Sequence, residues 1–339
     1  MKKLKLGIVG CGMLSQTVHI PCFYKNKKSE IVALCDRNKY LLSALSLKYK
    51  INKTYTSINK MIKNENLNAI ILTVQRPSTY KISKKILEAG INLFVEKPMA
   101  IKLDQAKELE KIKRKKKLKY IIAYMKRSDD AVEYFKKILK KKKYQYPKNV
   151  VYNSFMGIPK PVTNNFIPHE NKLRRKKYSL NKNFKNKKKV YKKYLNAQCH
   201  SINLIKHLLG KIFFEKALIS KNGEGSVFFN NYRKVNIQLK NKFLKSRNSN
   251  ETVELFYLNH YLKLVLQNPF NKNSKSKVIL KDSFKKKSII KKFKNWSFMN
   301  QSKNFIDYLK NNKINVLSDS NEGLEDIRII NQVFKEKLI

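Results

Sequence analysis

The turn "GCGMLS" near the start of the chain has the residue types that bind a phosphate group. It places Gly10, Gly12 and Ser15 at the spacing G-x-G-x-x-S, directly after an apolar run and before a helical one. The first glycine permits a tight turn, the second lets a pyrophosphate approach the backbone, and a small third residue permits close helix–strand packing. Free N–H groups at the helix N-terminus favour an anion. The spacing therefore predicts a dinucleotide site at Gly10, Gly12, Met13 and Leu14, with a glycine turn that binds nothing as the alternative.

A carboxylate ends the second predicted strand, "EIVALCD". At this position Asp36 would accept hydrogen bonds from the ribose hydroxyls of adenosine and would repel a 2′-phosphate, which favours NAD. Arg37 beside it weakens that preference, because a guanidinium group can pair with a 2′-phosphate or stack on adenine. The predicted cofactor is NAD, with NADP as the alternative.

Lys97 differs in position from most of the 76 Lys and Arg residues. In "NLFVEKP" it lies just past the carboxyl end of an apolar strand, at the edge where open α/β sheets bind their ligands. Pro98 restricts Lys97 toward an extended conformation, and Glu96 could hold the lysine or bond to a neighbouring loop. Glu96 and Lys97 are therefore candidate site residues, with a solvated loop lysine as the alternative.

A later helix, 194–210, combines apolar residues with a narrow polar stripe. Asn196, His200, Asn203 and His207 are spaced 4, 3 and 4 residues apart, which places them on one helix face. Such a stripe on a buried helix suggests the wall of a polar cavity. A core histidine bonded to a backbone carbonyl is the alternative.

The segment "AYMKR" ends the last strand of the first half. We expect Tyr124, Lys126 and Arg127 to face the cleft there. Two cations in a cleft suggest an anionic group on the substrate, such as a carboxylate or a nucleotide-sugar phosphate.

Two patterns of secondary structure must position these residues. The first 125 residues alternate between unbroken apolar runs and helical spacing, which is typical of a doubly wound α/β domain with a parallel sheet. After a linking helix at 129–142, closely spaced strands indicate an α+β domain with an open, mostly antiparallel sheet. The predicted strands are 4–10, 30–36, 68–74, 91–97 and 119–125, then 149–157, 211–220, 225–231, 234–240, 252–259, 261–267 and 276–282; the other predicted helices are 38–50, 78–90, 102–117, 299–311 and 321–336.

The expected domains follow from these elements. Residues 1–125 form the dinucleotide-binding domain, 126–320 form a substrate and oligomerisation domain, and 321–339 form a C-terminal helix that packs back on the first domain. The basic, low-complexity segment 171–193 is predicted to be a mobile loop.

The formal net charge of +53 has two interpretations. One is an anionic partner such as nucleic acid or a membrane surface. The other is genome composition, because Lys, Asn and Ile are all abundant and have A/T-rich codons, whereas only nine of the 76 basic residues are Arg. Arginine is the side chain preferred for phosphate and base recognition. We therefore expect no specific nucleic-acid partner.

The cysteines show no C-x-x-C pair and no histidine at metal-ligand spacing. We expect buried, reduced thiols, no metal site and a cytoplasmic protein. The sequence has no apolar run of about 18 residues, so we expect no membrane-spanning segment.

Together these stretches resemble the Gfo/Idh/MocA family of oxidoreductases over essentially the whole chain. The resemblance rests on "GIVGCG", "LEAGINLFVEKPMA", "HSINLIKHLLG" and "NFIDYLKNNKINVLSDSNEGLEDIRII". It implies an N-terminal NAD(P)-binding Rossmann domain, and a C-terminal domain whose open sheet often packs against another subunit in a homo-oligomer (dimer or tetramer). It also implies hydride transfer between a nicotinamide and a sugar, polyol or nucleotide-sugar.

By position, the resemblance makes Lys97 the residue that contacts the reacting hydroxyl and the nicotinamide ribose, and His200 the general base. The candidate substrate contacts are Lys97, Arg127, Asn196 and His200. Many members have aspartate where this chain has Asn196 and Asn203. We therefore expect a weaker base or a different substrate class.

Two other functions fit the sequence. The same two asparagines would suit a non-catalytic, dinucleotide-binding regulatory protein. The charge would suit a nucleic-acid-associated protein, although the chain is poor in Arg and has no zinc-finger or RNP-like motif.

Overall fold

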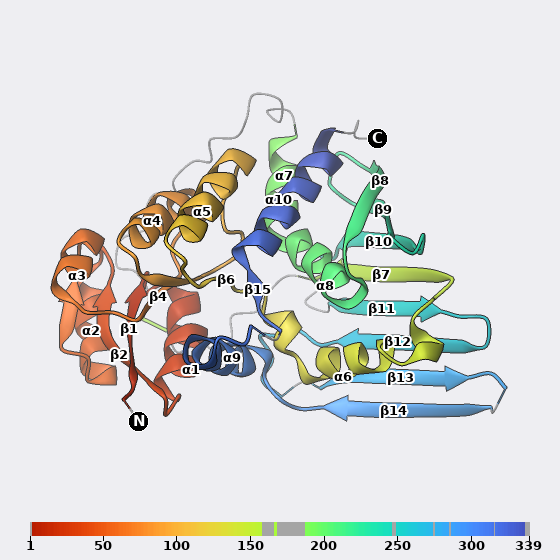
Figure 1. Ribbon diagram of the computed structural model, residues 1–339, viewed down its shortest axis with the longest axis horizontal. Helices are drawn as coiled ribbons and strands as arrows, with labels where there is room; N and C mark the ends of the chain where they lie inside the picture. Colours follow the sequence, from red (N-terminus) through yellow and green to blue (C-terminus); the bar gives the residue numbers. More distant parts are fainter. Residues whose placement is uncertain are drawn as a thin grey trace. The chain divides into compact units, whose positions relative to one another are not determined.

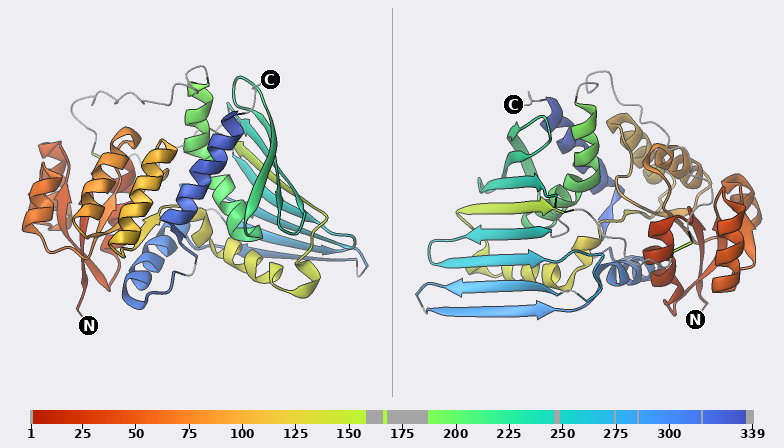
Figure 2. Two further views of the ribbon diagram at one scale, coloured as in Figure 1. Left: turned by 45° about the horizontal axis from the view of Figure 1, so that its top comes forward. Right: turned by 180° about the vertical axis from the view of Figure 1, so that it is seen from behind.

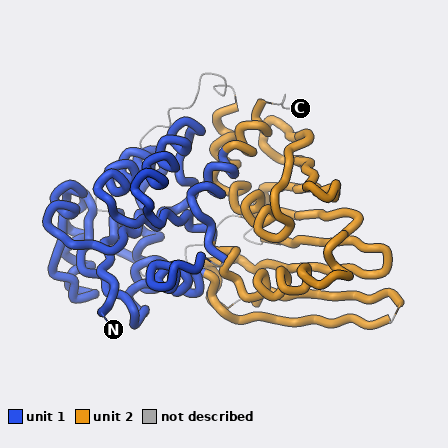
Figure 3. The backbone as a smooth tube through the Cα atoms, in the orientation of Figure 1, with its two compact units in different colours: residues 1–124, 162–180, 298–327 blue, residues 125–161, 181–297, 328–339 orange. Residues whose placement is uncertain are grey.

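A computed structural model describes residues 2–157, 166–167, 187–245, 249–273, 275–284, 286–314 and 316–335. The chain forms two compact units, coloured separately in Figure 3. Unit 1 comprises 1–124, 162–180 and 298–327, and unit 2 comprises 125–161, 181–297 and 328–339. The predicted second domain, 126–320, is therefore divided here. Residues 298–320 group with unit 1 because Phe305, Ile306 and Leu317 fill the hydrophobic core that also contains Leu6 and Ile8.

Unit 1 is built on a seven-stranded sheet in the order β15-β6-β5-β4-β1-β2-β3. Every described pairing is parallel except that of β15 with β6. The central strands are almost continuously buried, as expected when helices cover both faces of a sheet. The predicted doubly wound fold is confirmed. Its strands are β1 Leu4–Val9, β2 Ser29–Cys35, β3 Lys53–Tyr55, β4 Ala69–Leu72, β5 Asn92–Val95, β6 Tyr120–Ile122 and β15 Ser318–Asp319.

Helices lie on both faces of this sheet (Figure 1). Leu6 and Ile8 of β1 point to the face covered by α1, α2 and α9. Gly7 points to the opposite face, where Met61 of α3 packs against it. The helical elements are η1 Ser15–His19, α1 Ile20–Tyr24, α2 Lys39–Tyr49, α3 Ile58–Asn64, α4 Arg76–Glu88, α5 Leu103–Lys115 and α9 Ser297–Asn311, with α10 Ser320–Lys335 running through both units.

Unit 2 is built on an eight-stranded sheet in the order β14-β13-β12-β11-β7-β10-β9-β8. Its neighbours pair antiparallel except β7 and β10, which are parallel. The predicted open, mostly antiparallel sheet is confirmed. The strands are β7 Asn149–Met156, β8 Ile212–Ile219, β9 Gly225–Asn231, β10 Asn236–Phe243, β11 Asn250–Phe256, β12 His260–Leu266, β13 Ser276–Asp282 and β14 Lys287–Phe293.

The described helices of unit 2 lie on one face of this sheet (Figure 2). They are η2 Met125–Ser128, α6 Asp130–Leu139, η3 Lys142–Tyr144, α7 Lys188–Lys193, η5 Tyr194–Gln198 and α8 Cys199–Leu209.

The predicted loop 171–193 is wrong at its C-terminal end, where α7 begins at Lys188. Val190 and Tyr191 bury their side chains there, and the Tyr191 ring packs edge-to-face on Phe334 with a centroid distance of 5.2 Å. This burial fixes the helix despite its lysines. Residues 171–186 of the predicted loop lie outside the described residues.

Candidate functional site

The glycine turn is held between three strands of unit 1. The Gly10 N–H donates to the Cys35 carbonyl at 2.8 Å, and the Thr73 hydroxyl donates to the Gly10 carbonyl at 2.6 Å. Gly10 has a φ of +90°, and a Cβ there would lie 2.7 Å from the Thr73 carbonyl oxygen. Glycine is therefore required at position 10 by the backbone itself.

Gly12 differs from Gly10, because nothing in the described structure excludes a side chain at this position. A Cβ added at this residue would meet no described atom within 4 Å, so the packing of the protein does not exclude a side chain. The bare backbone instead leaves open space at the start of the helical segment, whose first bond runs from Gln16 N–H to the Gly12 carbonyl at 3.0 Å. This arrangement fits a pyrophosphate that approaches the backbone closely.

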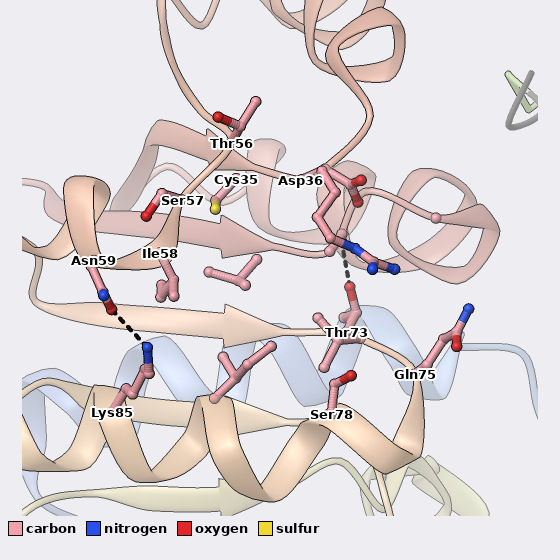
Figure 4. A pocket seen from close by; sticks show the side chains of 16 residues that line it. Cys35, Asp36, Thr56, Ser57, Ile58, Asn59, Thr73, Gln75, Ser78 and Lys85 are labelled. Carbon is pink, nitrogen blue, oxygen red and sulfur yellow. Dashed lines mark hydrogen bonds between the residues drawn. The ribbon is translucent and has the colours of Figure 1, made fainter. Parts of the chain in front are cut away.

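A pocket of about 360 Å³ lies at the carboxyl ends of β1, β2 and β4 (Figure 4). Of the predicted cofactor residues, Gly10, Gly12, Asp36 and Arg37 line it. The described lining of this pocket does not include Met13, Leu14, Glu96 or Lys97. The lining that sequence reasoning missed includes Thr56, Ser57, Asn59, Thr73, Gln75 and Lys85.

The missed lining residues follow strands β3 and β4, so recognising β3 would have pointed to Thr56 and Ser57. Two further lining residues, Asn59 and Lys85, form a hydrogen bond with each other. The Lys85 ammonium donates to the Asn59 side-chain oxygen at 3.1 Å, as Figure 4 shows.

Asp36 binds the turn as well as facing the pocket. Its Oδ2 accepts from the Cys11 N–H at 2.7 Å, and its Oδ1 accepts from the Asn38 N–H at 3.0 Å. Both bonds fix the orientation of the carboxylate. Burial and, to a lesser degree, this carboxylate raise the pKa of Cys35 to about 12 and the pKa of Cys11 well above its usual value. These two thiols are therefore neutral, and neither is a nucleophile in the pocket.

Glu96 and Lys97 follow β5 at the same edge of the sheet. Lys97 is partly buried, and the bond between it and Pro98 is cis. The Glu96 carboxylate accepts a hydrogen bond from His19 Nε2 at 2.7 Å. His19 was not a predicted site residue, because it lies 77 residues away in the sequence and only the fold brings it to Glu96.

Arg127, Asn196 and His200 belong to unit 2. His200 is buried on α8 together with Asn203 and His207, as the predicted stripe requires. Asn196 is exposed. It lies in the π-helical segment η5, which precedes the α-helix that carries His200.

Lys126 does not supply the free cation that the sequence suggested. It is buried in unit 2, where its ammonium lies 2.5 Å from the Glu251 carboxylate, which also accepts from the Tyr152 hydroxyl. The expectation fails for Lys126 because its charge is already paired. Arg127 is 5% exposed, close enough to His207 and Glu133 to shift their pKa values.

Within the described ranges, no group of three or more His, Cys, Asp or Glu side chains could hold a metal ion. No helix in the same ranges has the length and apolar character needed to cross a bilayer. The cysteines at 11, 22, 35 and 199 are buried, and they form no disulfide.

Comparisons with known proteins agree with this geometry. Residues 4–124 match GFO_IDH_MocA, the oxidoreductase family with an NAD-binding Rossmann fold. The chain is 25% identical to Oxidoreductase P35 of Formosa agariphila over 37% of its own length and 39% of that protein. It is 28% identical to D-apiose dehydrogenase of Paraburkholderia graminis over 32% and 29% of the two lengths.

A solved structure resembles the fold of both units. This is a 3-ketoreductase from Actinomadura kijaniata in complex with NADP and TDP-benzene, with a TM-score of 0.74, 13% identity and coverage of 98% of each chain. The chain matches well under half of the length of these two curated relatives. As the sequence predicted, residues 4–124 match the Gfo/Idh/MocA oxidoreductase family, which has an NAD-binding Rossmann fold.

Proposed function

We propose that this chain is an NAD(P)-dependent oxidoreductase that moves a hydride between a nicotinamide and a CH–OH carbon of a sugar, polyol or nucleotide-sugar. The observation that carries the proposal is the pocket lined by Gly12 and Asp36. No neighbouring atom excludes a side chain at Gly12, and hydrogen bonds fix the orientation of the Asp36 carboxylate. The family match and the name of the D-apiose relative support a sugar as the substrate.

The pocket residues fit a dinucleotide by their chemistry. Backbone N–H groups from Gly12 to Leu14 would hold the pyrophosphate, and Asp36 would accept from the adenosine ribose. Arg37 would stack on the adenine, or pair with a 2′-phosphate if the cofactor is NADP. When bound, the nicotinamide supplies the group that accepts or gives up the hydride.

His200 is the proposed general base, which removes the proton from the reacting hydroxyl. Histidine suits this task because it takes up and releases a proton near neutral pH. Lys97 would place positive charge where an alkoxide develops. Arg127 and Asn196 are proposed substrate contacts, and the asparagines at 196 and 203 can orient an imidazole or a hydroxyl without adding negative charge.

Replacement of the base tests this assignment. In His200→Ala we expect kcat to fall by about 10²- to 10⁴-fold on the preferred sugar, while the Kd of the nicotinamide cofactor stays near the wild-type value. His260→Ala is the matched control, because it removes a histidine of the same unit that faces Asp282 at 3.6 Å. Turnover by His200→Ala at the wild-type rate would contradict the assignment of His200 as the general base. Cofactor binding without turnover on any sugar or polyol would instead support the non-catalytic alternative.

We also infer that the protein forms a homo-oligomer through unit 2. The described helices cover one face of its sheet, and the strands expose apolar side chains. Burial against a second copy would remove these side chains from water. They include Phe213, Leu218, Phe256, Ile289 and Ile290.

A further inference from the structure

His19 and Glu96 of unit 1 form a buried histidine–carboxylate hydrogen bond. Nε2 of His19 donates to Oε1 of Glu96 at 2.7 Å, and the two side chains are 3% and 14% exposed. A hydrogen bond to an ionised acceptor is stronger than one between neutral groups. This contact therefore constrains the backbone on both sides of it.

The His19 ring is fixed by more than this bond. Its edge packs against Phe94 with a centroid distance of 5.7 Å and against Phe298 at 6.2 Å. Phe94 is itself a residue of β5, two positions before Glu96. These contacts hold the plane of the ring, and the bond to Glu96 directs Nε2 toward the carboxylate.

The bond joins two parts of the sheet edge that the chain keeps far apart. His19 ends η1, the helical segment that follows the glycine turn after β1. Glu96 follows β5, and β4 lies between β1 and β5 in the sheet. The proposed phosphate-binding turn and the segment that carries Lys97 are therefore tied together by one side-chain bond.

We propose that His19 is a positioning residue of the reaction: through Glu96 it fixes the turn that presents Lys97 to the reacting oxygen. The inference rests on the proposed function for its catalytic consequence. His19 does not line the pocket at Gly12, so its loss alters the position of Lys97 and leaves the adenosine end of the cofactor site intact.

The test compares His19→Leu, which removes the donor, with His19→Gln, whose amide N–H reaches a position similar to that of Nε2. His260→Leu is the matched control, because His260 also faces a carboxylate and packs edge-to-face on an aromatic ring, Tyr144 at 5.5 Å, but in unit 2. Three quantities are measured on each full-length protein: the Kd of NADH by fluorescence titration, kcat and KM on a panel of sugars, and hydrogen–deuterium exchange of the peptide spanning 92–101.

For His19→Leu we expect kcat to fall by about 10- to 100-fold, the cost of a small misplacement of a reacting group, with the Kd of NADH close to wild type. Exchange in 92–101 rises. His19→Gln restores most of kcat and of the protection, and His260→Leu changes neither quantity. If His19→Leu does not fold, Glu96→Ala removes the acceptor instead and is expected to lower kcat in the same range.

Two results would overturn the positioning role. One is a wild-type kcat in His19→Leu; the other is an equal loss in the Leu and Gln variants, which would show a structural effect unrelated to the bond. If the wild type binds NADH but turns over no sugar, the proposed function has failed, and the exchange data still decide about His19. Unchanged exchange in His19→Leu then contradicts the role, whereas exchange that rises and is restored by Gln supports it.

Discussion

At the scale of single residues, Asp36 combines two tasks in one side chain. Its oxygens hold the glycine turn through Cys11 and the next helix through Asn38, and the same carboxylate faces the proposed ribose position. A charge fixed in this way repels a 2′-phosphate without first having to reorganise. We therefore expect cofactor choice to depend on the charge of Asp36.

We expect Asp36→Asn to change cofactor preference, because it removes the charge; its amide keeps only one of the two backbone N–H bonds that Asp36 accepts. The ratio of NADP to NAD affinity should rise by about tenfold or more, since two charges a few ångströms apart near a surface interact by about 1–4 kcal/mol. Calorimetric Kd values for both cofactors measure this ratio. Asp104→Asn, at an exposed position on α5, is the control and should leave it unchanged. An unchanged ratio in Asp36→Asn would mean that Arg37 or Lys85 selects the cofactor.

Residues of the glycine turn could be predicted from sequence, because Gly10, Gly12 and Asp36 lie at fixed distances along the chain from their strands. His19 and Thr73 could not. Each acts through a partner more than 60 residues away, Glu96 and Gly10 respectively, and no local pattern marks such a pair.

At the scale of elements, the predicted strands and helices of both units are present because hydrophobic periodicity determined them. The exceptions have physical causes. β14 was missed because its residues are exposed and four in seven are polar, so it has no apolar run. β3 has only three residues, and β15 only two. Pairing with a neighbouring strand defines these elements, and pairing is not visible in a single sequence.

The π-helical segments η1 and η5 were also beyond prediction. Each interrupts a helix next to a predicted site, after the glycine turn and before His200. A sequence read at 3.6 residues per turn assigns a face to each residue, and one π-helical turn shifts that assignment. In the structure His200 and Asn203 are buried on α8, whereas Asn196 in η5 is exposed.

At the scale of the whole molecule, the formal net charge is +53, and some of the positive side chains lie close to the buried His207 of unit 2. His207 is buried on α8, and Lys136 lies 3.2 Å from its Nδ1. Burial, then the charges of Arg127 and Lys136, lower the pKa of His207 to about 2. This imidazole is therefore neutral in the folded protein at neutral and mildly acidic pH.

Stability should fall in acid because of His207. Above pH 6.5 the residue is neutral in both states, so it makes no difference to folding. As pH falls below 6.5, the unfolded chain binds a proton that the folded chain does not, and the free energy of unfolding decreases by about 1.4 kcal/mol per pH unit from this group.

Urea unfolding of wild type and His207→Gln at pH 7 and pH 5 measures this effect. The variant lacks the group, so the stability difference between the two proteins should shift by about 2 kcal/mol in favour of the variant between these pH values. Other histidines contribute equally to both proteins and cancel in the comparison. A difference that is independent of pH would show that His207 is protonated in the folded protein.

The nucleotide site in unit 1 is tested most directly by calorimetric titration of the purified full-length protein with NAD, NADH, NADP and NADPH. High salt suppresses non-specific binding of phosphates to the lysine-rich surface. We expect micromolar binding of NAD and NADH and weaker binding of the phosphorylated pair, because Asp36 faces the ribose position. Absence of binding by all four dinucleotides would contradict the assignment of the pocket at Gly12 and, with it, the oxidoreductase proposal.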